Sequence, residues 1–252
     1  ARTLLFGHLR LTSGELTERA ATPPVFGSTP QERQQLDTDL RHALSRGEFV
    51  LFYQPKVSCH SGAIVGAEAL IRWRHPQRGL VSPAEFIPIL EELTLIDDVG
   101  SWVVDEACRQ IGEWQAIGLE VPAISVNLSA QQLDDEHLVS KVRNALEKNG
   151  VRPDRLELEL TESLFAGDFD EIVAMMLKLK AIGIGFSLDD FGTGFSSLSY
   201  LRRLPLDQLK IDQSFVRNML ASPNDAAIAQ TVVALGRTLG LQVIAEGVET
   251  DE

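Results

Sequence analysis

Polar and apolar residues alternate strictly in several short stretches of this chain. In residues 156–160, Glu157 and Glu159 alternate with three leucines. Because successive side chains of a strand point to opposite faces, this stretch predicts a strand with one apolar and one acidic face. The same interpretation fits residues 125–129, 187–189, 208–212 and 241–246. Burying several unpaired carboxylates is costly unless a cation neutralises them, so the pattern favours a metal site.

Strand and helix patterns alternate along most of the chain. Strands are predicted near residues 49–57, 64–73, 122–128, 155–161, 184–189, 207–211 and 241–246. Amphipathic helices are predicted from residue 31 to a stop at Gly47, and at about 83–92, 99–117, 130–148, 168–182, 195–202 and 223–238. This alternation indicates parallel strands joined by helical crossovers. A closed barrel of this kind needs eight strands, so we expect the last strand and helix to be missing.

The chain is predicted to hold one barrel domain over residues 31–252, preceded by an N-terminal arm or linker over residues 1–30. Proline and glycine at positions 22–24 (TPP) and 27–30 (GSTP) support the linker. A length of 252 residues with 44% hydrophobic content is enough for one large core. The sequence shows neither a signal-peptide pattern nor an apolar run long enough to span a membrane. It also lacks an initiator methionine, which favours a fragment of a longer protein.

Charge and cysteine content restrict the function. A formal net charge of −13 argues against a protein that coats polymeric nucleic acid, although a metal ion would let the chain bind a small phosphorylated ligand. Cys59 and Cys108 are too few for a disulfide framework, which favours a reducing cytoplasm. The five histidines form no close pair, so zinc is not expected.

Polar residues are predicted to gather at the carboxyl ends of the strands, where barrels of this class carry their active sites. They are Glu68, Asn127, Glu159, the pair Asp189 and Asp190, Lys210, and Glu246. A single acid at a strand end usually caps a helix or faces solvent, but several in register favour a site. Oxygen ligands suit Mg²⁺ or Mn²⁺. The Asp-Asp pair offers a means of bridging two cations, as in sites that cleave phosphodiesters.

An ordered set of motifs resembles one known family. Glu68-Ala69-Leu70 followed by Ile71-Arg72-Trp73 resembles the signature of EAL-domain cyclic-di-GMP phosphodiesterases. Further motifs follow the family order: YQP at 53–55, VNLS at 126–129, ELTE at 159–162, LDDFGTG at 188–194, LKID at 209–212 and AEGVE at 245–249. The resemblance covers about residues 34–252, and the ordered set makes it specific where the triplet alone would not.

The resemblance implies a modified TIM-type (β/α)₈ barrel with an antiparallel first strand. It implies hydrolysis of cyclic di-GMP, a bacterial second messenger, to linear 5'-pGpG by metal-activated water. Its implied site has two ions, Mg²⁺ or Mn²⁺, with one held by Glu68, Asn127, Glu159 and Asp189 and the other by Asp189 and Asp190. Lys210 would hold and polarise the attacking water, Glu246 would orient water or Lys210, and Glu249 would support the site from behind.

The resemblance also assigns residues around the ions. Glu162 would fix the loop that follows Asp190, and Gln54 would contact the nucleotide. Arg72 lies four residues after Glu68 on the same strand face, which favours a phosphate contact over a surface ion pair. From the residues alone, Gln54 fits an ordinary strand-end amide equally well.

Two departures from the family pattern stand out. The family's late motif, a strand bearing a glutamine followed by a Gly-Tyr-aromatic segment, would come after Glu252. Thr94 stands where family members commonly have glycine.

Two other functions are alternatives to a cyclic-di-GMP phosphodiesterase. One is a receptor that binds cyclic di-GMP without cleaving it, and the other is an unrelated barrel enzyme with a single-metal carboxylate site. The complete set of expected ligands favours the phosphodiesterase. Family members are commonly fused to a sensor, receiver or GGDEF module, and a homodimer is compatible with the family. We expect a cytoplasmic domain that makes no membrane contact itself.

Overall fold

The computed structural model describes residues 4–7, 30–119, 122–192 and 198–248. Within them one sheet contains nine strands in the order β2-β1-β9-β8-β7-β6-β5-β3-β4, and β2 also pairs with β3. This additional pairing closes eight strands into a cylinder, while β4 extends β3 as a short hairpin arm. The strands are β1 (Leu4–Gly7), β2 (Phe49–Ser58), β3 (Ile64–His75), β4 (Gly79–Val81), β5 (Ala123–Asn127), β6 (Leu156–Thr161), β7 (Gly185–Phe191), β8 (Gln208–Ile211) and β9 (Gln242–Glu246).

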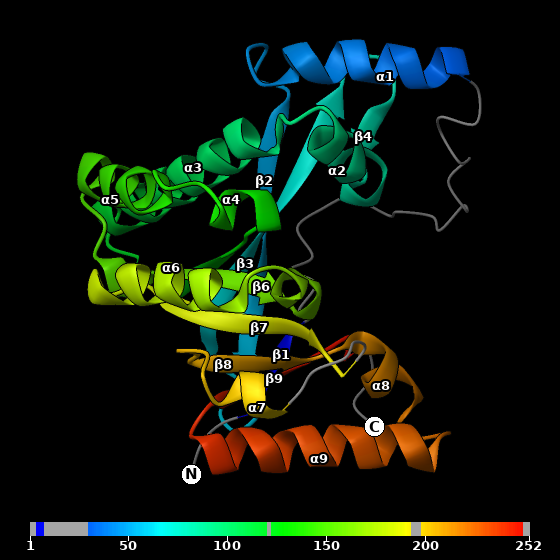
Figure 1. The fold of residues 1–252 in the computed structure, drawn as a ribbon, viewed down its shortest axis with the longest axis vertical. Helices are drawn as coiled ribbons and strands as arrows, with labels where there is room; N and C mark the ends of the chain where they lie inside the picture. The colour runs from blue at the N-terminus through cyan, green and yellow to red at the C-terminus, as the bar shows by residue number, and fades with distance from the viewer. Residues whose placement is uncertain (1–3, 8–29, 120–121, 193–197, 249–252) are drawn as a thin grey trace.

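Helices follow the strands and cover the outside of the sheet. In Figure 1, α1 lies at one end of the long strands β2 and β3, and α9 lies at the opposite end of the molecule beside β8 and β9. The described helices are α1 (Pro30–Ala43), α2 (Pro83–Glu92), α3 (Ile96–Ala116), α4 (Ala130–Leu133), α5 (Leu138–Asn149), α6 (Phe169–Ala181), α7 (Leu198–Leu201), α8 (Gln213–Asn218) and α9 (Pro223–Leu239), with short 3₁₀ turns at Pro153–Arg155 and Glu162–Ala166.

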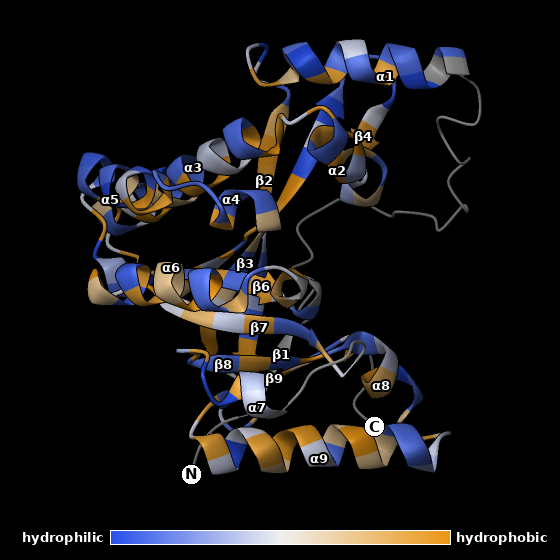
Figure 2. Cartoon of the chain, in the orientation of Figure 1, coloured by the Kyte–Doolittle hydropathy of each residue, from blue (hydrophilic) through white to orange (hydrophobic). Residues whose placement is uncertain are grey.

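The predicted fold class is confirmed. β3, β5, β6, β7, β8 and β9 run parallel to one another around the sheet, and β2, the first of the predicted strands, runs antiparallel to β3. All seven predicted strands form, with ends within two residues of the predicted ones. The described helices pack with apolar faces inward. Figure 2 shows α9 rich in apolar residues and α1 largely hydrophilic.

The N-terminal region differs from the sequence prediction. Four residues of the expected arm or linker form β1, which pairs parallel to β9 and antiparallel to β2. β1 therefore lies between β9 and β2 and completes the eight-stranded barrel. The sequence had predicted that this eighth strand was missing. A four-residue strand in a proline- and glycine-rich stretch has no periodic signal long enough to predict.

The helix predicted over residues 130–148 is broken into α4 and α5. Ser129 and Gln132 form a capping box at the start of α4. After it, the Asp135 side chain accepts a hydrogen bond of 2.8 Å from the backbone N–H of His137. Aspartate side chains that bind nearby backbone in this way compete with helix formation.

Aromatic residues contribute to the packing of the described part of the chain. Trp73 is fully buried, its ring lies 6.0 Å from that of Phe86, and its indole N–H donates to Glu48 Oε2 at 2.9 Å. Trp114 meets Tyr53 edge-on at 4.9 Å. Among the described helices, none combines the length and apolar character required to cross a bilayer.

Candidate active site

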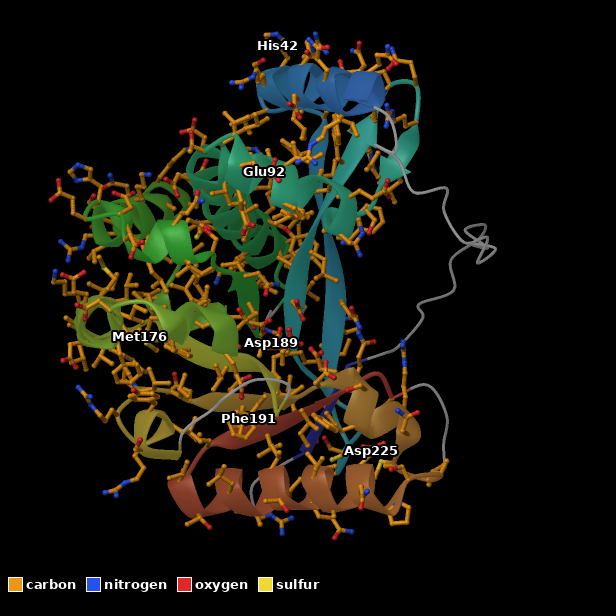
Figure 3. The ribbon with its side chains drawn as sticks, turned by 45° about the vertical axis from the view of Figure 1, so that its right-hand side comes forward. His42, Glu92, Met176, Asp189, Phe191 and Asp225 are labelled. Atoms are coloured by element: carbon orange, nitrogen blue, oxygen red, sulfur yellow. The ribbon has the colours of Figure 1, made fainter. Side chains whose placement is uncertain are left out.

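Four carboxylates converge on the ammonium group of Lys210. The Lys210 Nζ lies 3.1 Å from Glu68 Oε2, 2.8 Å from Glu159 Oε2, 2.7 Å from Asp189 Oδ2 and 2.7 Å from Glu246 Oε1. Lys210 itself is 1% exposed. Figure 3 shows Asp189 in the middle of the molecule, close to the long strands β2 and β3. Five strands, β3, β6, β7, β8 and β9, thus contribute one charged side chain each to a single point.

Strand alternation explains this convergence. The register pairs Asn127 with Glu159, and these residues lie at the carboxyl ends of β5 and β6. Their leucine neighbours point outward into the helix layer, where Leu158 and Leu160 are fully buried. Since parallel strands end at the same edge of the sheet, the polar positions of successive strands meet inside the mouth of the cylinder.

The acidic residues form two groups that share one member. Carboxylate oxygens of Glu68, Glu159 and Asp189 all lie within 4.8 Å of one another, as do those of Asp189, Asp190 and Glu246. Asn127 lies beside the first group and donates a hydrogen bond of 2.9 Å to Glu68 Oε1. Hard oxygen donors at this spacing fit Mg²⁺ or Mn²⁺.

The charges of the site are unbalanced without cations. When fully ionised, the two acidic groups together carry five negative charges, of which the Lys210 ammonium offsets one, while the Lys56 ammonium is balanced by Glu157. Divalent cations at the two acidic groups would offset this charge, so the donor set fits such ions.

Protons partly balance the charge in the ion-free chain. Burial, together with the nearby Asp189 carboxylate, raises the pKa of Glu246 to about 7 in spite of Lys210. Burial and the neighbouring Asp189 also raise the pKa of Asp190 to about 6. Burial opposes ionisation of Glu159 too, but the ammonium groups of Lys56 and Lys210 hold its pKa at about 2. Lys210 keeps its proton, because the surrounding carboxylates outweigh its burial and raise its pKa.

A distortion of β7 brings two consecutive aspartates to one site. Side chains of adjacent strand residues normally point to opposite faces. The pairing of β7 with β8 is irregular between Leu188 and Phe191, and Asp190 has a φ of 53°. Aspartate adopts this left-handed backbone conformation more readily than most residues do, and the conformation turns Asp190 toward the same mouth as Asp189.

A second lysine lies directly beneath the site. Lys56 on β2 is 5% exposed, and its Nζ lies 2.7 Å from Glu159 Oε1 and 3.0 Å from Glu157 Oε1. It also donates to Ser125 Oγ, which in turn donates to Glu157 Oε1 at 2.6 Å. Lys56 is not among the site residues predicted from the sequence. The signal was present, because Lys56 follows Gln54 by two residues and so shares its strand face.

The remaining predicted residues lie around this centre. Gln54 pairs in register with Glu68 and lines a cavity of about 230 Å³ at the mouth. The Arg72 guanidinium lies 5.8 Å from the ring centre of Phe52 and donates to the Ile71 carbonyl at 2.9 Å. Glu162 accepts a hydrogen bond of 3.1 Å from the backbone N–H of Gly192, at the start of the loop it was expected to fix.

Other residues at the mouth were missed or cannot be placed. Gln213 and Arg217 of α8 line the same cavity as Gln54, and no sequence signal singled them out. Glu249 lies outside the described residues, as does most of the loop after Gly192.

Fold and site together define an α/β barrel with an acidic mouth whose carboxylates are spaced to hold a metal ion. The chain belongs to the EAL domain family, whose family model matches residues 37–252.

Named relatives share much of the chain. The bifunctional diguanylate cyclase/cyclic di-GMP phosphodiesterase MucR of Pseudomonas aeruginosa is 50% identical over 226 residues, which are 90% of this chain and 33% of MucR. Cyclic di-GMP phosphodiesterase NbdA of the same organism is 43% identical over 218 residues, which are 86% of this chain and 28% of NbdA. The chain thus spans about a third or less of the length of these relatives.

A solved structure supports the same fold. The structure described as PaMucR phosphodiesterase in complex with c-di-GMP is 50% identical and superposes with a TM-score of 0.83. The match covers 86% of this chain and 88% of that one.

Proposed function

We propose that this chain is a phosphodiesterase that hydrolyses cyclic di-GMP to linear 5'-pGpG with two divalent ions, Mg²⁺ or Mn²⁺. The observation that carries the proposal is the sharing of Asp189 by two acidic groups around Lys210. Family membership and the names of the relatives as cyclic di-GMP phosphodiesterases support it. Bound divalent ions would supply a water of lowered pKa and neutralise charge on the phosphate oxygens.

The chain's own residues have distinct tasks in this proposal. Glu68, Asn127, Glu159 and Asp189 would hold the first ion, and Asp189 and Asp190 would hold the second. Lys210 is a permanently charged donor, so it positions the attacking water and cannot accept its proton. Glu246 contacts Lys210 at 2.7 Å and orients either that ammonium group or the water.

The substrate is bound by residues around the mouth. Gln54 lines the cavity beside Glu68 and contacts the nucleotide, while Arg72 reaches a phosphate from the outer end of β3. Glu162 holds the backbone at Gly192 and so fixes the segment that carries Asp189 and Asp190. Glu249 supports the site from behind.

The chain is proposed to act as one module of a larger cytoplasmic protein. Its relatives are about three times its length or more, and MucR combines two named activities. A sensor, receiver or GGDEF module would then regulate the barrel, and two barrels would form a homodimer. The proposed partner is cyclic di-GMP rather than polymeric nucleic acid, and no membrane contact is assigned to the barrel itself.

Incubation of the chain with cyclic di-GMP and Mg²⁺ or Mn²⁺, followed by chromatography, tests the proposal. We expect pGpG to form and EDTA to stop its formation. Asp189→Asn, which removes a charge from both acidic groups at nearly constant volume, should form no product. Cyclic di-GMP that is bound but never cleaved would contradict the proposal and identify a receptor.

A further inference from the structure

The Glu159 carboxylate is held by two lysines from opposite sides. Its Oε2 faces Lys210 at 2.8 Å on the side of Glu68 and Asp189, and its Oε1 faces Lys56 at 2.7 Å on the side of Glu157. Glu159 is 1% exposed and Lys56 is 5% exposed, so water does not compete for either contact. The two oxygens of one carboxylate are therefore assigned to different partners.

We propose that Lys56 is a positioning residue for the cation site, which fixes Glu159 through Oε1 so that only Oε2 faces the ions. This inference rests on the proposed function, because it assumes that Glu159 is an ion ligand. The Lys56 ammonium group contacts Glu159, Glu157 and Ser125. It acts through Glu159, as groups behind metal ligands commonly orient them.

The position of Lys56 is itself fixed by three acceptors. Its ammonium group donates to Glu157 Oε1 at 3.0 Å and to Ser125 Oγ as well as to Glu159. An ammonium group has three donors and no acceptor, so these contacts use its full hydrogen-bonding capacity. The Ser125 hydroxyl also donates a hydrogen bond of 2.6 Å to Glu157 Oε1, so the acceptors around Lys56 form one hydrogen-bond network.

The alternative is that Lys56 only balances charge. The two roles predict opposite effects on ion affinity. A lysine that merely adds positive charge near the ions repels them, so its removal would tighten ion binding. A lysine that orients a ligand strengthens binding, and loss of such a group typically weakens metal affinity by about 10–100-fold.

A titration with Mn²⁺ in the absence of substrate, in which the EPR signal reports the concentration of free Mn²⁺, separates the two roles. We expect Lys56→Met to raise the Mn²⁺ dissociation constant about tenfold. Lys56→Arg keeps both charge and donors, and a cavity of about 310 Å³ beside Lys56 offers room for it, so affinity should largely return. Lys148→Met is the matched control, since Lys148 is an exposed lysine paired with Asp105 at 2.8 Å.

Lys56→Gln provides a second variant in case Lys56→Met does not fold. It retains a donor for Glu159 Oε1 without the charge, and we expect an affinity between those of the wild type and the methionine variant. Unchanged or tighter Mn²⁺ binding by either folded variant would overturn the inference. A wild-type chain that does not bind Mn²⁺ would overturn the proposed function, and the inference with it.

Discussion

Thr94 has a φ of 55°, in the left-handed region that β-branched residues rarely adopt. It lies between α2 and α3, where its N–H donates to the Glu91 carbonyl at 3.1 Å. The family resemblance expects glycine at this position, and glycine alone reaches this backbone conformation without steric cost. Thr94 therefore carries local strain that the expected glycine would avoid.

We predict that Thr94→Gly raises the free energy of unfolding by about 1 kcal/mol. A left-handed residue with a Cβ costs about 1–2 kcal/mol, and the greater backbone freedom of glycine in the unfolded chain offsets part of the gain from removing it. Thermal unfolding should show a rise of about 2–4 °C. Thr94→Ala is the control, because it also loses the 2.7 Å bond from Thr94 Oγ1 to the Leu93 carbonyl but keeps Cβ. An equal rise in both variants would show that the backbone is not the source of strain.

Ligand and donor roles at the site are separable by substitution. Glu68→Ala removes a member of the first acidic group, so we expect loss of one ion and of turnover with the fold retained. Lys210→Ala should retain both ions and lower kcat by about 10²–10³-fold, the usual effect of losing one preorganised donor. Mn²⁺ stoichiometry and pGpG formation, measured on both variants, check the assignment. Full turnover in Lys210→Ala would remove Lys210 from the mechanism.

At the scale of elements, strand alternation explains most of what could be predicted. Glu68, Glu159 and Lys210 were found because each lies on the inner face of a regular strand. Asp190 at the same mouth was not predictable from alternation, because only the irregularity in β7 turns it there. Asp190 was instead selected as an acid that follows Asp189 at the end of a strand, and the family resemblance then implied its role as an ion ligand.

β1 was missed for a different reason. Its pairing with β9 from Leu4 to Gly7 and with β2 at Leu5 and Phe6 depends on strands more than 40 residues away in sequence. Local pattern cannot reveal such a non-local partner. The break between α4 and α5 was missed because the Asp135 turn is a side-chain effect inside an otherwise helical stretch.

Deletion of residues 1–29 should destabilise the barrel and promote its association. Without β1, the edges of β9 and β2 would expose unpaired N–H and C=O groups, which recruit strands of other chains. Size-exclusion chromatography and thermal unfolding would measure both effects. Leu5→Pro is the matched variant, because it removes a strand N–H at constant length and should shift both readouts in the same direction. A deletion variant with unchanged stability and size would refute this role for β1.

At the scale of the whole molecule, the acidic mouth makes stability depend on pH and on cations. The partly buried residues Glu68, Asp190 and Glu246 have raised pKa values, so the ion-free folded chain binds more protons than the unfolded chain between about pH 4.5 and 7. Stability must therefore fall as pH rises through this window. Glu159 has a lowered pKa, so its ionised carboxylate stabilises the folded chain, and this stabilisation is lost only as pH falls below about 4.5 toward 2.

We predict that thermal stability of the ion-free chain falls by several degrees from pH 5 to pH 8. Glu246 alone accounts for up to about 3 kcal/mol of this change. Saturating Mg²⁺ or Mn²⁺ should abolish the slope, because cations then replace the protons. The Glu246→Gln variant should have a shallower slope without ions. A flat profile of the ion-free wild type would contradict the electrostatic account of the mouth.

Anomalous diffraction from crystals grown with Mn²⁺ would locate the ions among the acidic groups. We expect two peaks about 3.5–4 Å apart. One should contact Glu68, Glu159 and Asp189, and the other Asp189 and Asp190, so that Asp189 touches both. Well-ordered crystals with no peak at Asp189, or with Mn²⁺ bound only elsewhere, would contradict the proposed two-ion site.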